Sequence, residues 1–327
     1  MHKGMGMGMG MGMGLGLGLD VGGTRCRWAL ADSQGQVIEE GHCGSFNGQQ
    51  VHTEEGRQHI RQQLSAVHAA VQAALQRRSG AAHLVAVWAG VTGYDGPGGQ
   101  SPATHPCLRS HLAVCLGLEV QALWLYNDVE LAHRVSLRPA SGYLVYAGTG
   151  CIATYLDEHE RLHRVGGRGE TLGDDGSGYW IGCQALKAIW RAEDEQPGFV
   201  GRSVLAQALF QVVGGPDWED TRRFMQLASR GDVGRLALAV SAVADQDVLA
   251  QRLLTQAGEE LARLAHLLLR RFGPRRVGYT GRAFDLHPLL VSSMVAALPT
   301  DIVVERVSVD AHRVAAQGAA GAVAAAP

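Results

Sequence analysis

The sequence lacks the cysteine spacing of zinc ribbons and of disulfide frameworks. Its six cysteines are scattered and form no CxxC pair, which excludes a small fold held together by disulfides. We therefore expect free thiols in a reducing, cytoplasmic environment. The 14 histidines form no HExxH pair and no Cys/His array with metal-ligand spacing, so the sequence predicts no zinc site.

A strong excess of charge of one sign is also missing. The formal net charge is -2 over 327 residues, and the isoelectric point is about 6.7. Because no broad basic field is present to hold nucleic acid or an anionic lipid surface, we expect no nucleic acid and no membrane partner. Long apolar runs are absent too, since no segment approaches the ~20 apolar residues of a membrane span.

The chain opens with a Gly/Met/Leu dipeptide repeat. Alternate glycines give this repeat little hydrophobic mass, and no small-residue cleavage site follows it, so it does not fit a signal peptide. We expect residues 1–12 to be a flexible extension, because glycine at every second position costs backbone entropy and offers no side chain for packing. The end of the repeat is interpreted as the first β-strand, which leads into LDVGGT at 19–24.

The remaining sequence has the composition and periodicity of an α/β protein. It is 46% hydrophobic and 18% charged, and its length suggests two domains. We place these domains at 1–132 and 133–327. Residues 1–132 read β-β-β-α-β-α-β-α, and the second half repeats the three-strand start before helical insertions, late strands and an alanine-rich closing helix. The predicted strands cover 25–32, 36–43, 83–91, 123–128, 143–150, 151–157, 161–167, 275–281 and 302–307, and the predicted helices cover 60–75, 108–118, 179–191, 204–213, 253–268 and a segment from 311.

Two glycine turns indicate contacts to phosphate. In LDVGGT, Asp20 ends a strand and the turn formed by Gly22, Gly23 and Thr24 lets backbone N–H groups approach phosphate oxygens. A carboxylate beside such a turn suits Mg²⁺, bound through water, which offsets the charge of a triphosphate. An ordinary hairpin turn is the alternative.

The segment AGTGC repeats this arrangement in the second half. Gly148, Thr149 and Gly150 follow a predicted strand, and the Thr149 hydroxyl is placed to donate to a terminal phosphate. Here, too, a plain hairpin is the alternative when the segment is considered alone. Two such turns in duplicated halves together favour a nucleotide site.

Three further segments contain candidate site residues. Asp128 follows the apolar strand LWLYN and therefore lies where α/β sheets place their ligands, so it is a candidate general base for phosphoryl transfer. Its alternative role is to cap the next helix. In LGDDGSG, Asp174 or Asp175 is a candidate ligand for a sugar hydroxyl or for outer-sphere Mg²⁺. Gly281 in YTGRA is a candidate for close backbone approach to a flat ligand such as adenine.

Taken in order, these stretches resemble the phosphate-1, connect, phosphate-2 and adenosine motifs of the sugar kinase, heat-shock chaperone and actin superfamily. Within it the chain is similar to the BadF/BadG/BcrA/BcrD ATPase group, and most similar to its N-acetylglucosamine kinases. LGDDGSGYWIG at 172–182 is the most specific segment, because the group carries a nearly identical LGDEGSGYWIG-type segment. The resemblance spans essentially the whole chain from residue 17. One departure is Arg168, which stands where the family segment often has an aromatic residue.

The resemblance implies two ribonuclease-H-like domains of the actin-like ATPase type with a nucleotide cleft between them. It implies ATP with Mg²⁺ and transfer of the γ-phosphate to the 6-hydroxyl of an amino sugar, with N-acetylglucosamine as the first choice of acceptor. The resemblance also implies a homodimer. The positions that match the family's nucleotide motifs are Asp20, Gly22, Gly23, Thr24, Gly148, Thr149, Gly150 and Gly281; Asp128 matches its base; and the sugar-binding positions are Asn47, Thr92, Gly93, Asp128, Asp174 and Asp175.

Other functions stay open at this point. A glucosamine or other hexosamine kinase uses the same motifs with a different acceptor. A dehydratase activator of the BadF/BadG type needs paired cysteine thiolates for an iron–sulfur cluster, and Cys151 has no obvious partner in the sequence. A nucleotide-binding regulator without turnover does not need a base, and Asp128 therefore argues against it.

Overall fold

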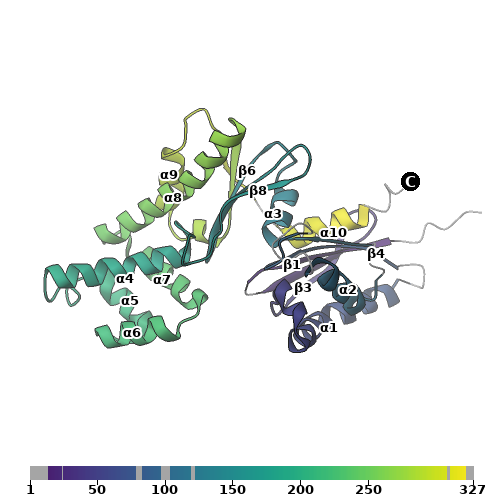
Figure 1. Ribbon diagram of the computed structural model, residues 1–327, viewed down its shortest axis with the longest axis horizontal. Coiled ribbons are helices and arrows are strands. Elements are labelled where there is room, and N and C mark those ends of the chain that lie inside the picture. Colours follow the sequence, from purple (N-terminus) through teal and green to yellow (C-terminus); the bar gives the residue numbers. More distant parts are fainter. Residues whose placement is uncertain are drawn as a thin grey trace, which may run out of the picture. The chain divides into compact units, whose positions relative to one another are not determined.

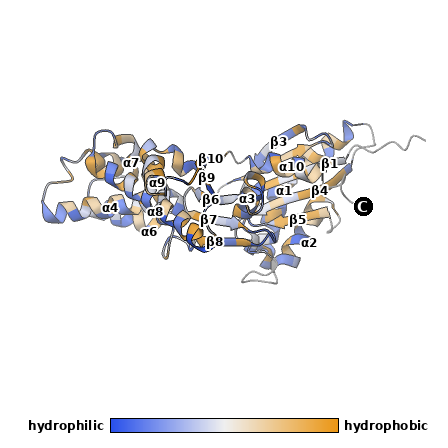
Figure 2. Ribbon diagram, turned by 90° about the horizontal axis from the view of Figure 1, so that it is seen from above, coloured by the Kyte–Doolittle hydropathy of each residue, from blue (hydrophilic) through white to orange (hydrophobic). Residues whose placement is uncertain are grey.

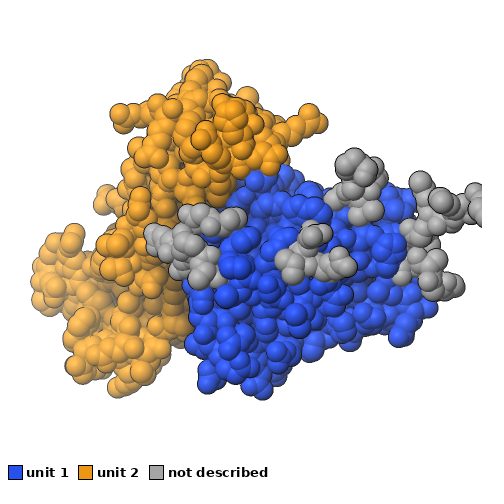
Figure 3. Space-filling model, turned by 45° about the vertical axis from the view of Figure 1, so that its right-hand side comes forward, with its two compact units in different colours: residues 1–135, 309–327 blue, residues 136–308 orange. Residues whose placement is uncertain are grey.

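The computed structural model describes residues 14–23, 25–78, 83–96, 104–118, 122–307 and 310–321 (Figure 1). The chain divides into two compact units. Unit 1 comprises residues 1–135 and 309–327, and unit 2 comprises residues 136–308 (Figure 3). The sequence analysis expected the closing helix in the second domain, whereas the structure assigns it to unit 1.

Unit 1 contains a five-stranded sheet in the order β3-β2-β1-β4-β5. Its strands are β1 (Gly14–Val21), β2 (Cys26–Ala31), β3 (Val37–Cys43), β4 (His83–Val91) and β5 (Leu123–Tyr126). The first three strands form an antiparallel meander, while β4 pairs parallel with both β1 and β5. The carboxyl ends of β1, β4 and β5 therefore meet at one end of the sheet, which is where α/β sheets bind ligands.

Helices cover both faces of this sheet. They are α1 (Glu54–Gln76), α2 (Thr104–Leu116), α3 (Asp128–Ser136) and α10 (Ala311–Gly321), with a short 3₁₀ helix η1 (Gly48–His52) before α1. The Thr53 side chain caps α1, and Ile60, Leu64, Val67 and Val71 form its buried stripe at helical spacing. Figure 2 shows the apolar character of β1, β4 and β5, which lie within this core.

The alternation of glycine and leucine in β1 matches two different neighbours. Leu15, Leu17 and Leu19 are fully buried in the core that includes α1 and α2. Gly16 and Gly18 face α10 so closely that a β-carbon at either position would overlap with the helix backbone. Part of the repeat thus has a packing role, because glycine on one face of a strand allows an alanine-rich helix to lie directly on it.

Unit 2 contains a sheet with the same topology. Its order is β10-β9-β6-β7-β8, with β6 (Gly142–Ala147), β7 (Cys151–Leu156), β8 (Leu162–Gly166), β9 (Arg276–Thr280) and β10 (Val304–Arg306). Again three antiparallel strands are followed by two parallel ones, which continue from the first strand of the meander. The turn after β1 and the turn after β6 are therefore equivalent positions of two duplicated sheets.

Helices form most of the remainder of unit 2. They are α4 (Gly178–Glu195), α5 (Val204–Val213), α6 (Trp218–Leu227), α7 (Arg230–Val243), α8 (Val248–Phe272) and α9 (Pro288–Ala296), with a 3₁₀ helix η3 (Arg282–Asp285) after β9. The long helix α8 packs against β6, β7 and β8, while α4 packs against α7. The Asp247 side chain caps α8 through the backbone N–H groups of Leu249 and Ala250. The predicted α/β fold with two similar halves and helical insertions in the second is confirmed.

Candidate functional site

The predicted residues of unit 1 gather at the carboxyl ends of the parallel strands. Asp20 on β1 pairs in register with Gly90 on β4, and Gly90 pairs with Tyr126 on β5. The backbone N–H of Thr92 donates to the carbonyl oxygen of Val21 at 2.9 Å, which ties the segment after β4 to the first glycine turn. The strand register thus brings the end of β1 and the segments after β4 and β5 to one place.

The first glycine turn is closed by backbone and side-chain contacts. The N–H of Gly22 donates to the carbonyl oxygen of Arg25 at 3.1 Å, and the Ser45 hydroxyl donates to the carbonyl oxygen of Gly22. A β-carbon at Gly23 would meet nothing within 4 Å, so this position is open to a ligand. Thr24, which we also predicted for this turn, lies outside the described residues.

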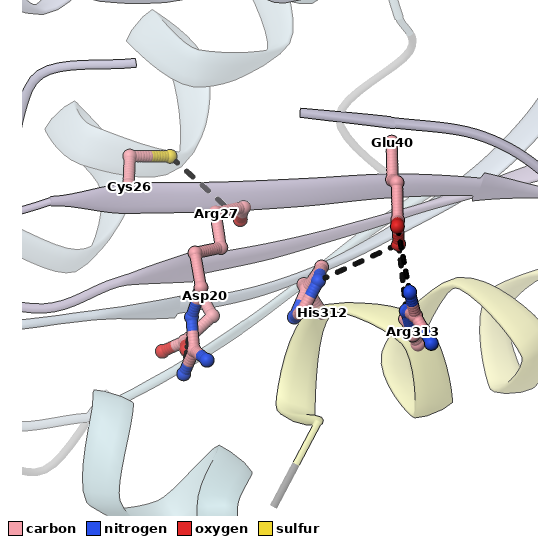
Figure 4. A network of polar contacts seen from close by, with 6 residues as sticks. All are labelled: Asp20, Cys26, Arg27, Glu40, His312 and Arg313. Atoms are coloured by element: carbon pink, nitrogen blue, oxygen red, sulfur yellow. Dashed lines mark hydrogen bonds and ion pairs between the residues drawn. The ribbon is translucent and has the colours of Figure 1, made fainter. Parts of the chain in front are cut away.

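Asp20 has a cationic partner that the sequence analysis did not identify. Arg27 lies opposite Asp20 on β2, and its Nη2 and Nε atoms lie 2.6 and 3.2 Å from Oδ2 of Asp20 (Figure 4). Both contacts end on the same oxygen, so Arg27 leaves Oδ1 of Asp20 to other partners. The register of β1 and β2 is the only signal for this pair, because the two residues are seven positions apart and belong to no common motif.

Asp128 is the first residue of α3 and is partly buried. Burial raises the pKa of its carboxyl to about 6, and the nearby Asp20 carboxylate acts in the same direction. Backbone N–H groups and the Thr92 hydroxyl donate to the carboxylate and partly oppose this rise in pKa. A carboxyl with this pKa is mostly ionised at neutral pH and still basic enough to accept a proton.

The other predicted sugar-binding residues of unit 1 lie beside Thr92. Asn47 is exposed and caps η1 by accepting a hydrogen bond from the N–H of Gln49 at 2.8 Å. Gly93 has a φ of 72°, and a β-carbon there would overlap with the Asn47 side chain. The close contact between Asn47 and Gly93 therefore requires glycine at position 93. Unit 1 thus brings together all of its described candidate residues.

The second glycine turn is bound to the start of α4. The N–H of Gly148 donates to the carbonyl oxygen of Gly150 at 2.8 Å, which closes the turn between β6 and β7. The first N–H groups of α4 then donate to the turn, from Gly178 to Gly148 at 2.9 Å and from Tyr179 to Thr149 at 3.1 Å. The backbone of this turn is therefore fixed by the helix that follows LGDDGSG.

Gly281 also lies against this turn. It has a φ of 111°, and a β-carbon there would overlap with the backbone of Ala147, the last residue of β6. Only glycine fits this combination of backbone angle and backbone contact. Unit 2 therefore brings the candidate residues Gly148, Thr149, Gly150 and Gly281 together.

The two adjacent acids of LGDDGSG have different surroundings. Asp174 is buried, accepts a hydrogen bond from the N–H of Cys151 at 3.1 Å and forms an ion pair with Arg230. Asp175 is more exposed and lies 3.2 Å from Arg263. Of the two carboxylates, that of Asp175 is therefore more accessible to a ligand. Arg168, also in this segment, has an exposed side chain.

The Asp20 carboxylate at the first glycine turn suits a magnesium ion that is held mainly by water and phosphate. Within the described part of the chain, no group of three or more His, Cys, Asp or Glu side chains converges as a metal site. Mg²⁺ usually keeps several waters and takes one or two carboxylates together with substrate phosphates. Asp20, at the first glycine turn and with Oδ1 not used by Arg27, fits this role.

Neither unit contains, in its described residues, a helix long and apolar enough to span a membrane.

All six cysteines are free thiols. Cys151 is buried, and its thiol donates to the carbonyl oxygen of Asp175 at 3.0 Å. Burial raises the pKa of this thiol, which makes it a poor metal ligand.

Two curated proteins match parts of this chain. A kinase for N-acetylmuramic acid and N-acetylglucosamine from Clostridium acetobutylicum is 29% identical over 138 residues, which cover 41% of this chain and 44% of the relative. An N-acetyl-D-glucosamine kinase from Dictyostelium discoideum is 41% identical over 54 residues, 16% of this chain and 17% of the relative. The chain thus spans less than half the length of these curated relatives.

A solved structure similar to this fold comes from Porphyromonas gingivalis, from a protein provisionally named N-acetylglucosamine kinase. It has a TM-score of 0.71 at 17% identity, covering 93% of this chain and 98% of the other. The likeness confirms the predicted fold of two ribonuclease-H-like domains. The model of the BadF/BadG/BcrA/BcrD ATPase family matches residues 17–324. The chain therefore belongs to the BadF/BadG/BcrA/BcrD ATPase family.

Proposed function

We propose that this protein is an ATP-dependent sugar kinase that transfers the γ-phosphate of ATP to the 6-hydroxyl of an amino sugar. The observation that supports this most is Asp128, a partly buried carboxylate with a pKa raised to about 6 beside Asp20 at the ligand-binding end of the sheet. The names of the curated relatives, kinases for N-acetylglucosamine and N-acetylmuramic acid, support N-acetylglucosamine as the first acceptor to test.

Each group in the proposed mechanism has a separate role. Asp128 accepts the proton of the sugar hydroxyl as that oxygen attacks the γ-phosphorus, and ADP leaves on the opposite side. The backbone of the two glycine turns binds phosphate oxygens, and Thr149 donates its hydroxyl to the terminal phosphate. Asp20 would hold Mg²⁺ through water; when bound, this ion offsets the charge of the triphosphate.

We assign the sugar to the residues beside the base. Asn47, Thr92 and Gly93 lie together in unit 1, and Asn47 is exposed. In unit 2 we favour Asp175 over Asp174 for direct contact, because the Asp174 carboxylate is buried against Arg230. Glucosamine and other hexosamines remain alternative acceptors. We assign adenine to the backbone beside Gly281.

A coupled assay of ADP release over a panel of hexoses and amino sugars tests this function. We expect strong stimulation by N-acetylglucosamine in the presence of MgATP and little ADP release without a sugar. Stimulation by another hexosamine would keep the mechanism and change the acceptor. Equal ADP release with and without every sugar would contradict the proposal and favour a nucleotide-binding ATPase.

The pH dependence of activity follows from the Asp128 carboxyl. Because the base must be ionised, kcat/KM should rise with pH and level off above a midpoint near the pKa of about 6. The measurement is kcat/KM for the sugar at subsaturating ATP between pH 5 and 8. A profile that is flat across this range would exclude Asp128 as the titrating base.

The same pKa gives a stability effect with a defined sign. The pKa of Asp128 in the folded protein is above the ordinary value of 3.8, so the folded state holds this proton more tightly than the unfolded state. The contribution of Asp128 to stability is therefore fully present below the ordinary value and is lost as pH rises through about 6. Proton uptake should thus favour the folded, inactive form in mild acid.

A homodimer and a cytoplasmic location are further parts of this proposal. The free thiols fit a reducing compartment. The dehydratase-activator alternative is less well supported, because Cys151 is buried and its thiol already donates to a backbone carbonyl.

A further inference from the structure

The start of α4 lies beside the second glycine turn but offers no free N–H groups to phosphate. In many phosphate sites the first N–H groups of a helix bind the anion. Here the N–H groups of Gly178 and Tyr179, at the start of α4, already donate to the carbonyl oxygens of Gly148 and Thr149. These donors hold the turn in place and are not free to bind phosphate.

Arg230 brings a cation to this turn. It is the first residue of α7, and its Nη2 atom lies so close to Gly150 that a β-carbon at position 150 would overlap with it. The absence of a side chain at Gly150 is therefore what allows the guanidinium to lie against the turn. The planar guanidinium presents several N–H donors in a geometry that suits phosphate oxygens.

The carboxylate partners of Arg230 do not use all of its donors. Nη2 contacts the Asp174 carboxylate, and Nε lies 3.4 Å from Oε2 of Glu170. The Asp174 side chain is 2% exposed, whereas that of Arg230 is 41% exposed. Asp174 thus holds Nη2 of Arg230 at the turn from within the fold, while the rest of this partly exposed side chain is open to solvent.

We infer that Arg230 is a phosphate ligand for the nucleotide, positioned at the second glycine turn by the buried Asp174 carboxylate. This inference rests on the proposed function, because it assigns a residue to the same nucleotide site. It adds a binding residue that belongs to none of the sequence motifs.

A purely structural role for Arg230 is the competing explanation. Arg230 neutralises a buried carboxylate, and an unpaired buried charge destabilises a fold strongly. Arg230→Gln alone could therefore reduce binding by unfolding unit 2. The double variant Arg230→Gln/Asp174→Asn removes both charges together and separates the two explanations.

The experiment is calorimetric titration of the whole protein, without sugar, using MgATP and adenosine as probes. We expect Arg230→Gln to weaken MgATP binding about tenfold to hundredfold, as for loss of a charged hydrogen bond, and to leave adenosine binding unchanged. The double variant should recover thermal stability but not MgATP affinity. Arg235→Gln is the matched control, because Arg235 lies on the same helix and pairs only locally, 2.9 Å from Asp232.

The outcomes separate this inference from the proposed function. Recovery of MgATP affinity in the double variant, or equal losses for MgATP and adenosine, would overturn the assignment of Arg230. If the unchanged protein binds MgATP but phosphorylates no sugar, the proposed function fails and the assignment of Arg230 can still hold. If the unchanged protein binds neither probe, both fail.

Discussion

Asp128→Asn is expected to lose sugar phosphorylation by about 10²–10⁴-fold, the usual contribution of a positioned general base. The amide has nearly the shape of the carboxylate, but it cannot accept the proton of the attacking hydroxyl. We expect ATP affinity to stay unchanged, because Asp128 is assigned to the acceptor and not to the nucleotide. Initial rates of sugar phosphorylation and calorimetric titration with MgATP measure the two quantities separately.

Loss of activity in this variant should not come from unfolding. The raised pKa means that the ionised carboxylate of Asp128 is less favourable in the folded state than in water, so removing its charge should not destabilise the protein. Glu130→Gln is the matched control, since Glu130 lies on the same helix and pairs with Arg134 at 3.0 Å. Comparable activity in Asp128→Asn and in the control would remove Asp128 from the mechanism.

Gly18→Ala is expected to have the largest effect on stability, with a loss of about 3 kcal/mol, the upper end of the usual range for overpacking. A β-carbon at Gly18 would overlap with the carbonyl oxygen of His312 and would also meet the backbone nitrogen of Ala316. Backbone atoms of α10 cannot rotate away as a side chain does, so the helix must shift from β1. A loss of this size lowers the Tm by roughly 6–12 °C, which a thermal melt measures.

Gly231→Ala serves as the control for this variant. Gly231 is in the first turn of α7, and a β-carbon there would meet only the Ser229 hydroxyl oxygen, at 3.7 Å. Alanine should stabilise the helix by up to about 1 kcal/mol. An unchanged Tm in Gly18→Ala would mean that α10 does not pack tightly on β1.

The strands and the site of unit 1 were predictable because local patterns determine them. The continuous apolar run of β4 and the Gly-Gly turn after Asp20 are readable over a few residues, and β4 has the predicted bounds. Once the parallel strands are assigned, their carboxyl ends must meet, which brings Asp20, Thr92 and Asp128 together.

Several helices were not predicted, and their composition explains why. Helix α6 is short, polar and mostly exposed, with only Thr221 buried, so its few apolar residues give too brief a pattern to predict a helix. Helix α9 is apolar on most sides and gives no clear helical period. Helix α7 has two glycines in its first half, which weaken the helical signal.

The partners that come from distant parts of the chain could not be inferred from sequence. The glycines of β1 fit against the alanines of α10, although these two elements are far apart in the sequence. The ion pair of Glu40 with Arg313, which also joins β3 to α10, has the same origin (Figure 4). Arg230 reaches Asp174 across 56 positions. Such pairs carry no local pattern, and only the three-dimensional fold reveals them.

The most direct test of the central claim is phosphorus NMR of the products formed from MgATP and N-acetylglucosamine. The account predicts that the γ-phosphate signal is lost in proportion to the gain of a sugar phosphomonoester, and that proton–phosphorus coupling places the ester on the 6-hydroxyl. Release of inorganic phosphate at the same rate with and without sugar, and no phosphomonoester, would contradict it.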